Sequence, residues 1–131
     1  MTNLTKSLHG LLATSGLPEP VMISLDYHDA RISIQPAVNA YTDPVAVLSA
    51  LLLWSRLLHG ITATWRHSPE GNLHITIDGR LQSGTRVRLY QGVPFDTVRE
   101  WVLLAPGQRD SVSLDELAGL IRDLHTTRPA A

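Results

Sequence analysis

The densest group of residues that could take part in catalysis is Asp26, His28 and Asp29, at the tip of a predicted hairpin. Carboxylate and imidazole groups transfer protons in enzymes, but they act together with a nucleophile or a substrate site. No candidate nucleophile is tied to this group, and the chain has no Gly-x-Ser-x-Gly and no phosphate-binding glycine loop. Asp and His are also common at hairpin tips because they suit turns. We therefore expect a protein without catalytic activity.

Six histidines, at positions 9, 28, 59, 67, 74 and 125, raise the question of a metal site. His67 and His74 could meet across the turn that they flank. No two histidines have the i,i+4 spacing of a helical metal site, and no cysteine or Glu-x-x-His pattern accompanies them. We expect neither a metal nor another cofactor.

A mostly basic strip on one face of a predicted strand pair is the main candidate for ligand binding. Its residues are Arg66, His74, Asp78, Arg80, Arg86, Arg88 and Tyr90. The four arginines could follow a phosphate backbone while Tyr90 stacks on a base. The alternative is a solvated sheet face whose charges prevent aggregation, with Asp78 and Arg88 as a cross-strand pair.

Length and composition limit the classes of protein that need to be considered. The 131 residues are 44% hydrophobic and 18% charged with a net charge of −1, which predicts one folded domain spanning 1–131. Such a charge provides no overall attraction to nucleic acid or membranes, so any charge-driven binding must be local. The absence of cysteine excludes disulfides. We find no signal peptide or membrane segment, and expect a cytoplasmic protein.

Helical and strand patterns alternate along the chain. Leucines at helical spacing predict a helix over 1–16, and alternating apolar residues predict a hairpin over 21–35. Asp43 as the N-cap, Pro44 in the first turn and Gly60 after the end predict a central helix over 43–59. A Ser113–Glu116 capping box opens a last helix over 113–125, after which 126–131 should fray.

Between the last two helices, residues 61–105 predict a meander of strands. Opposed residues of an antiparallel pair share a face, so a two-residue loop at Ser83 and Gly84 would place Leu81 opposite Arg86 and mix core with solvent. We therefore choose a three-residue loop over 82–84, which keeps the apolar residues together. That register pairs Ile77 with Leu89 and Asp78 with Arg88. Residues 96–105 fit either a helix or a strand, and we choose a final strand. The predicted fold is α+β, with an antiparallel sheet of about five to six strands packed with three helices.

The central helix is apolar around most of its circumference, which is typical of a helix that is buried on all sides or contacts another subunit. Trp54 and Leu58 are the candidates for such a contact surface. We therefore predict a non-catalytic accessory protein that acts through a homo-oligomer, such as a homodimer, or through a protein partner. Nucleic-acid binding through Arg66, Arg80, Arg86, Arg88 and Tyr90 is the alternative.

Four segments carry a resemblance to known proteins: 51–54 (LLLW), 61–65 (ITATW), 73–81 (LHITIDGRL) and 83–87 (SGTRV). Together with their surroundings, over 45–120, they resemble small proteins of GC-rich actinobacteria, often associated with phages or other mobile elements. The resemblance covers more than half of the chain and implies an accessory role. It transfers no catalytic or binding residue, because none is assigned in those proteins.

Overall fold

A computed structural model describes residues 22–36 and 43–127, so the predicted helix over 1–16 and the end of the predicted tail lie outside the described residues. The strands are β1 (Met22–Asp26), β2 (Arg31–Gln35), β3 (His59–His67), β4 (Asn72–Arg80), β5 (Arg86–Pro94) and β6 (Arg109–Ser111). The helices are α2 (Pro44–Ser55), the 3-10 helix η1 (Phe95–Thr97) and α3 (Leu114–Thr127). None of the described helices is long and apolar enough to cross a membrane.

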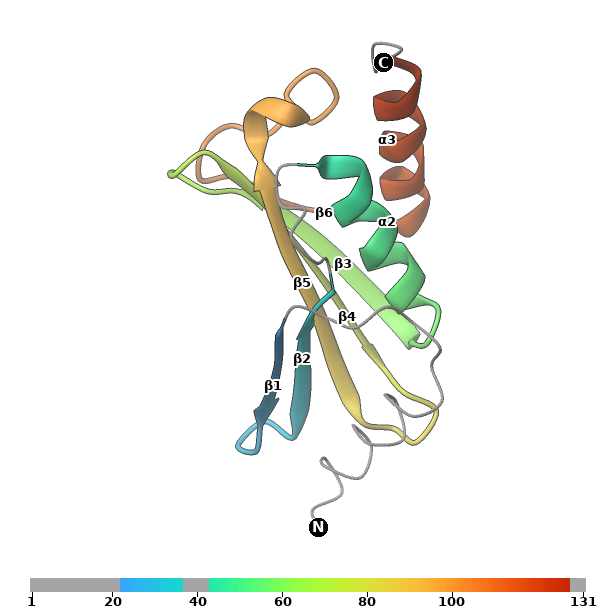
Figure 1. Cartoon of the computed structure of the whole chain (residues 1–131). Coiled ribbons are helices and arrows are strands. Elements are labelled where there is room, and N and C mark those ends of the chain that lie inside the picture. The colour runs from blue at the N-terminus through green and yellow to red at the C-terminus, as the bar shows by residue number, and fades with distance from the viewer. Residues whose placement is uncertain (1–21, 37–42, 128–131) are drawn as a thin grey trace.

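The strands form one mixed sheet in the order β1-β2-β5-β4-β3-β6 (Figure 1). The class is α+β as predicted, but the sheet is not wholly antiparallel, because β2 and β5 are parallel and pair Ile32 with Val87. The reason is the helix between the hairpin and the meander. A helical crossover lets the next strand run in the direction of the previous one, and β5 regains that direction after two antiparallel reversals.

The predicted register of the meander is confirmed. Ile77 pairs with Leu89 and Asp78 with Arg88 across β4 and β5. The loop over 82–84 is closed by hydrogen bonds between Leu81 and Thr85 and between Gly84 and Leu81, and Gly84 has a φ of +91°. Glycine adopts this conformation without steric cost, which is why the loop ends on it.

Both described α-helices pack on the same side of the sheet (Figure 1). Helix α2 contacts β5 on one side and α3 on the other, which explains its apolar circumference. It begins as predicted, because the Asp43 carboxylate accepts hydrogen bonds from the N–H groups of Val45 and Ala46. Helix α3 likewise begins with the predicted capping box, in which Ser113 and Glu116 exchange hydrogen bonds.

Helix α2 ends at Ser55, earlier than predicted. The Ser55 hydroxyl bonds to the carbonyl of Leu52, and the N–H groups of Leu57 and Leu58 turn back to carbonyls three residues earlier. His59 then pairs with Arg80 as the first residue of β3.

Trp54 and Leu58 are only 2% and 7% exposed, so the prediction that they form a contact surface is corrected. Leu58 packs against Gly79 of β4, where a Cβ would lie 2.9 Å from the Leu58 Cβ. Both side chains belong to the hydrophobic core of the protomer.

The predicted strand within 96–105 is wrong. Phe95–Thr97 is a 3-10 helix, and the following loop buries Val98, Val102 and Leu104 in the core. Burial at these positions gave the segment its strand-like composition. The chain returns to the sheet only at β6, which pairs with β3 and lies between the predicted meander and the predicted last helix, where no strand was predicted.

Candidate functional site

The face of the sheet opposite α2 and α3 carries the polar side chains of the strands. The register sets them in rows: Arg66 stands beside His74 on one side and beside Arg109 on the other. The next row contains Thr64, Thr76 and Tyr90. Four strands, β3 to β6, therefore contribute to one polar surface.

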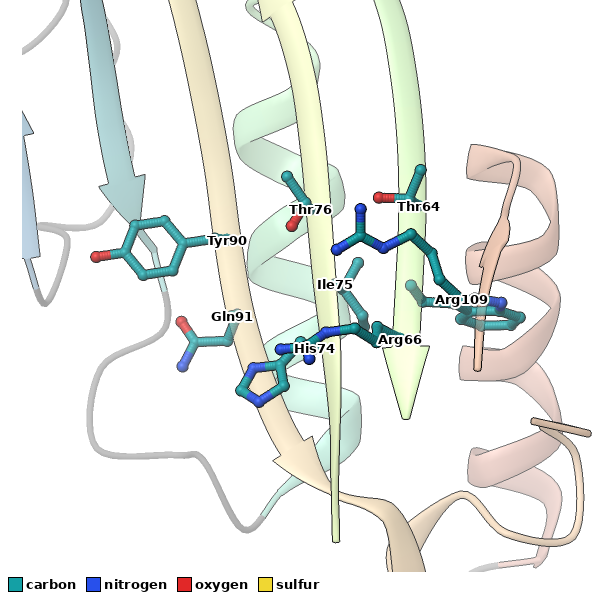
Figure 2. A pocket seen from close by; sticks show the side chains of 9 residues that line it. Thr64, Arg66, His74, Ile75, Thr76, Tyr90, Gln91 and Arg109 are labelled. Carbon is teal, nitrogen blue, oxygen red and sulfur yellow. The ribbon is translucent and has the colours of Figure 1, made fainter. Parts of the chain in front are cut away.

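These two rows enclose a groove of about 220 Å³, which we call the Arg66–Arg109 groove (Figure 2). Its polar lining is formed by Arg66, Arg109, His74, Thr64, Thr76, Tyr90 and Gln91. Figure 2 shows the guanidinium groups of Arg66 and Arg109 both reaching toward β4. The groove therefore gathers two cations, two hydroxyl groups, an imidazole and an aromatic ring.

The charge of the groove is not neutralised within the described part of the chain. The side chains of Arg66 and Arg109 form no ion pair or hydrogen bond with a described residue, and no carboxylate of the described residues lines the groove. Asp78, in the adjacent row, is bound by Arg88 through N–O distances of 2.7 and 3.3 Å. This hydrogen bond raises the pKa of Arg88 and occupies both partners. Two guanidinium groups that line one groove and have no partner among the described residues favour the binding of an anion.

The other predicted arginines are engaged in the fold. Arg80 donates to the carbonyl of Gly84 at 3.0 Å, and Arg86 to that of Asp29 at 3.2 Å. The predicted strip is therefore divided. Arg66 and Tyr90 lie in the groove, whereas Arg80, Arg86 and Arg88 also support turns or a cross-strand pair.

Gly92 makes room for the imidazole of His74. The two residues are paired across β4 and β5, and a Cβ on Gly92 would lie 3.3 Å from the His74 Nδ1. The exposed His74 ring therefore lies over the glycine backbone at the end of the groove. Tyr90 extends toward β2, with its hydroxyl 3.6 Å from the Met22 sulfur.

Arg109 was not among the residues that the sequence predicted, because it follows a turn and belongs to a strand of only three residues. The loop before it is fixed to the end of β3 by His67. The His67 Nδ1 lies 2.8 Å from the carbonyl oxygen of Leu104, and backbone hydrogen bonds join His67 to Gln108 and Gly107. Because a carbonyl oxygen only accepts, Nδ1 carries the proton. The His67 ring is also stacked on Phe95, with ring centroids 3.6 Å apart.

No family model, curated protein or solved structure matches the chain. The resemblance to small actinobacterial proteins stays a prediction.

The group Asp26, His28 and Asp29 lies at the β1–β2 turn, as predicted. The Asp26 carboxylate accepts a hydrogen bond from the N–H of Asp29, and this bond lowers the pKa of Asp26. Arg31 lies within 4 Å of both carboxylates, at 3.9 and 3.8 Å. These contacts are those of a stabilised turn. Within 22–36 and 43–127, no three histidine or carboxylate residues are grouped so that they could hold a metal.

Proposed function

We propose that the protein is a non-catalytic module that binds single-stranded nucleic acid on the open face of its sheet. The observation that carries the proposal is the convergence of Arg66 and Arg109, without partners among the described residues, on a groove that contains no carboxylate. Planar guanidinium groups bind phosphate, as they bind carboxylate, through two parallel hydrogen bonds.

The dimensions of the face fit an extended strand of nucleic acid. From His74 to Arg80, β4 rises by roughly 20 Å at about 3.3 Å per residue, which is long enough for several nucleotides. Proteins that bind single strands combine a positive groove with aromatic side chains on which bases stack. Here the half-buried Tyr90 lies beside the groove and can provide that platform.

Charge is distributed so that one face is favoured. The helix on the opposite side of the sheet, α3, carries three carboxylates, Asp115, Glu116 and Asp123, against one arginine, Arg122, so it repels phosphate overall. This asymmetry supports local binding by a chain whose net charge is only −1.

The test is the fluorescence anisotropy of a labelled single-stranded oligonucleotide titrated with protein at several salt concentrations. The logarithm of the affinity should fall linearly with that of the salt concentration, with a slope of about −0.7 per phosphate contact. The double variant Arg66→Gln/Arg109→Gln should weaken binding and reduce the slope by about 1.4, because two contacts are lost.

The matched control is Arg56→Gln/Arg122→Gln, which removes the same charge from two exposed residues outside the groove. It should leave the slope unchanged. Absence of binding at low salt, or an equal loss in the control, would refute the proposal.

A protein partner or a second copy of the chain is the second candidate. It is favoured by Leu103, whose side chain is 90% exposed on the loop after η1. Trp54 and Leu58 cannot serve this role while they remain buried. Light scattering of the parent and of Leu103→Ser separates the candidates, because a dimer formed through this loop dissociates in the variant. A cytoplasmic location is part of either proposal, and cell fractionation tests it.

A further inference from the structure

We infer that the Arg66–Arg109 groove binds the terminal phosphate monoester at one end of a nucleic-acid strand. This inference rests on the proposed function and specifies the ligand of the same groove. It follows from the charge of the groove, its position on the sheet and the residues in the adjacent row.

The charge of the groove matches a dianion. Arg66 and Arg109 provide two positive charges, and neither charge is neutralised by a described residue. A phosphodiester within a strand carries one negative charge, whereas a terminal monoester carries about −1.5 to −2 at neutral pH and has three acceptor oxygens. A monoester therefore neutralises both guanidinium groups, and a diester leaves one charge unmatched.

The number of donors also favours a monoester. Each guanidinium has five N–H donors, and the hydroxyl groups of Thr64 and Thr76 line the same groove. Because His74 is exposed over Gly92, its ring can add a further donor. Three phosphate oxygens can accept from these groups simultaneously, which the two free oxygens of a diester cannot match.

The position of the groove suits the end of a strand. Arg66 and His74 are the last β3–β4 pair on this face before the turn between these strands, in which Ser68 is only 1% exposed. In the opposite direction, the row beyond Thr64 and Thr76 contains Asp78, whose side chain is 39% exposed and bound to Arg88. The groove, which no described carboxylate lines, is therefore the position on this face where a phosphate group meets the least negative charge.

The experiment compares three oligonucleotides of one sequence, with a 5′-phosphate, a 3′-phosphate or hydroxyl groups at both ends, by the same anisotropy measurement. A phosphoserine peptide provides a monoester from a protein. One of the phosphorylated oligonucleotides should bind about tenfold more tightly than the unphosphorylated one, because charge-assisted hydrogen bonds are added.

Variants assign this preference to the groove. Arg66→Gln and Arg109→Gln should each reduce the preference for the phosphorylated end, with the fold retained by circular dichroism. Arg86→Gln, at the other end of the face, should weaken the binding of phosphorylated and unphosphorylated oligonucleotides by the same factor. Arg122→Gln, on α3, should change neither affinity.

Equal affinity for phosphorylated and unphosphorylated strands would overturn the inference and leave the proposed function intact. Failure of every oligonucleotide to bind would overturn both. Binding of the phosphoserine peptide as tightly as the phosphorylated strand would overturn the assignment to nucleic acid.

Discussion

The imidazole of His67 fastens the loop that carries Arg109 to the end of β3, and replacing it tests how the groove is held. His67→Phe keeps an aromatic ring next to Phe95 but removes the N–H that lies 2.8 Å from the Leu104 carbonyl. Leu104 is only 8% exposed, so its carbonyl loses its partner in a buried position. A buried acceptor without a partner costs about 1–3 kcal/mol, and we expect this loss in the free energy of unfolding.

In His67→Phe, the loop before Arg109 should become more mobile but stay attached to the end of β3. Backbone hydrogen bonds of 3.0 Å from His67 to Gln108 and of 2.6 Å from Gly107 to His67 remain in the variant. Amide hydrogen exchange at Gly107 should therefore accelerate by roughly 5- to 150-fold, which corresponds to the same 1–3 kcal/mol. Affinity for the oligonucleotide should fall as well, because Arg109 is held less firmly beside Arg66.

A second variant separates the hydrogen bond from the stacked ring. His67→Asn retains a side-chain N–H donor but removes the aromatic ring, so it should restore slow exchange at Gly107 more than His67→Phe does. Urea unfolding gives the total stability of each variant. If His67→Phe unfolds at the parental urea concentration and exchanges Gly107 at the parental rate, the bond to Leu104 does not hold the loop.

The remaining predictions concern packing and acid sensitivity. Gly79→Ala should lower the free energy of unfolding by about 1–3 kcal/mol, because the added Cβ forces Leu58 aside. Gly119→Ala in α3 should raise it by up to about 1 kcal/mol, because the Cβ has room and alanine favours a helix. A higher thermal midpoint for Gly79→Ala than for Gly119→Ala would refute this packing. Trp54→Ala should lower the free energy of unfolding by about 3–5 kcal/mol at every protein concentration, because the ring is buried within one protomer. A thermal midpoint of the parent that rises with protein concentration would contradict this. The pKa of Asp26 is lower in the folded protein than in the unfolded chain, so its carboxylate stabilises the fold at pH values above its pKa in the unfolded chain. This stabilisation is lost as the pH falls through the pKa of Asp26 in the folded protein. Asp26→Asn should therefore reduce the loss of stability on acidification, which urea unfolding at several pH values measures.

Local chemistry made several elements predictable from the sequence. Asp43, Ser113 and Gly84 each determine the conformation of residues within a few positions of themselves, through a cap or a left-handed turn. The pairing of Asp78 with Arg88 followed from parity, because a three-residue loop keeps the apolar residues on one face and a two-residue loop does not.

Contacts between distant segments could not be predicted in this way. The composition of β2 does not specify that it pairs with β5, and Arg109 has no local pattern that places it beside Arg66. The basic strip was visible as residue types. The sequence does not show which of these arginines form hydrogen bonds within the fold, because their acceptors can lie far away along the chain. Arg86, for example, donates to the carbonyl of Asp29.

The parallel pairing of β2 with β5 also has a consequence for the order of folding. Residues 31–34 pair with residues 86–89, so this contact closes a long loop, whereas β4 and β5 are joined through residues 82–84. Closing a longer loop costs more chain entropy, so the meander should form first and the β1–β2 hairpin should join it late. Ile32→Val in stopped-flow experiments should therefore accelerate unfolding while leaving the folding rate almost unchanged, and a slower folding rate would place the hairpin in the folding nucleus.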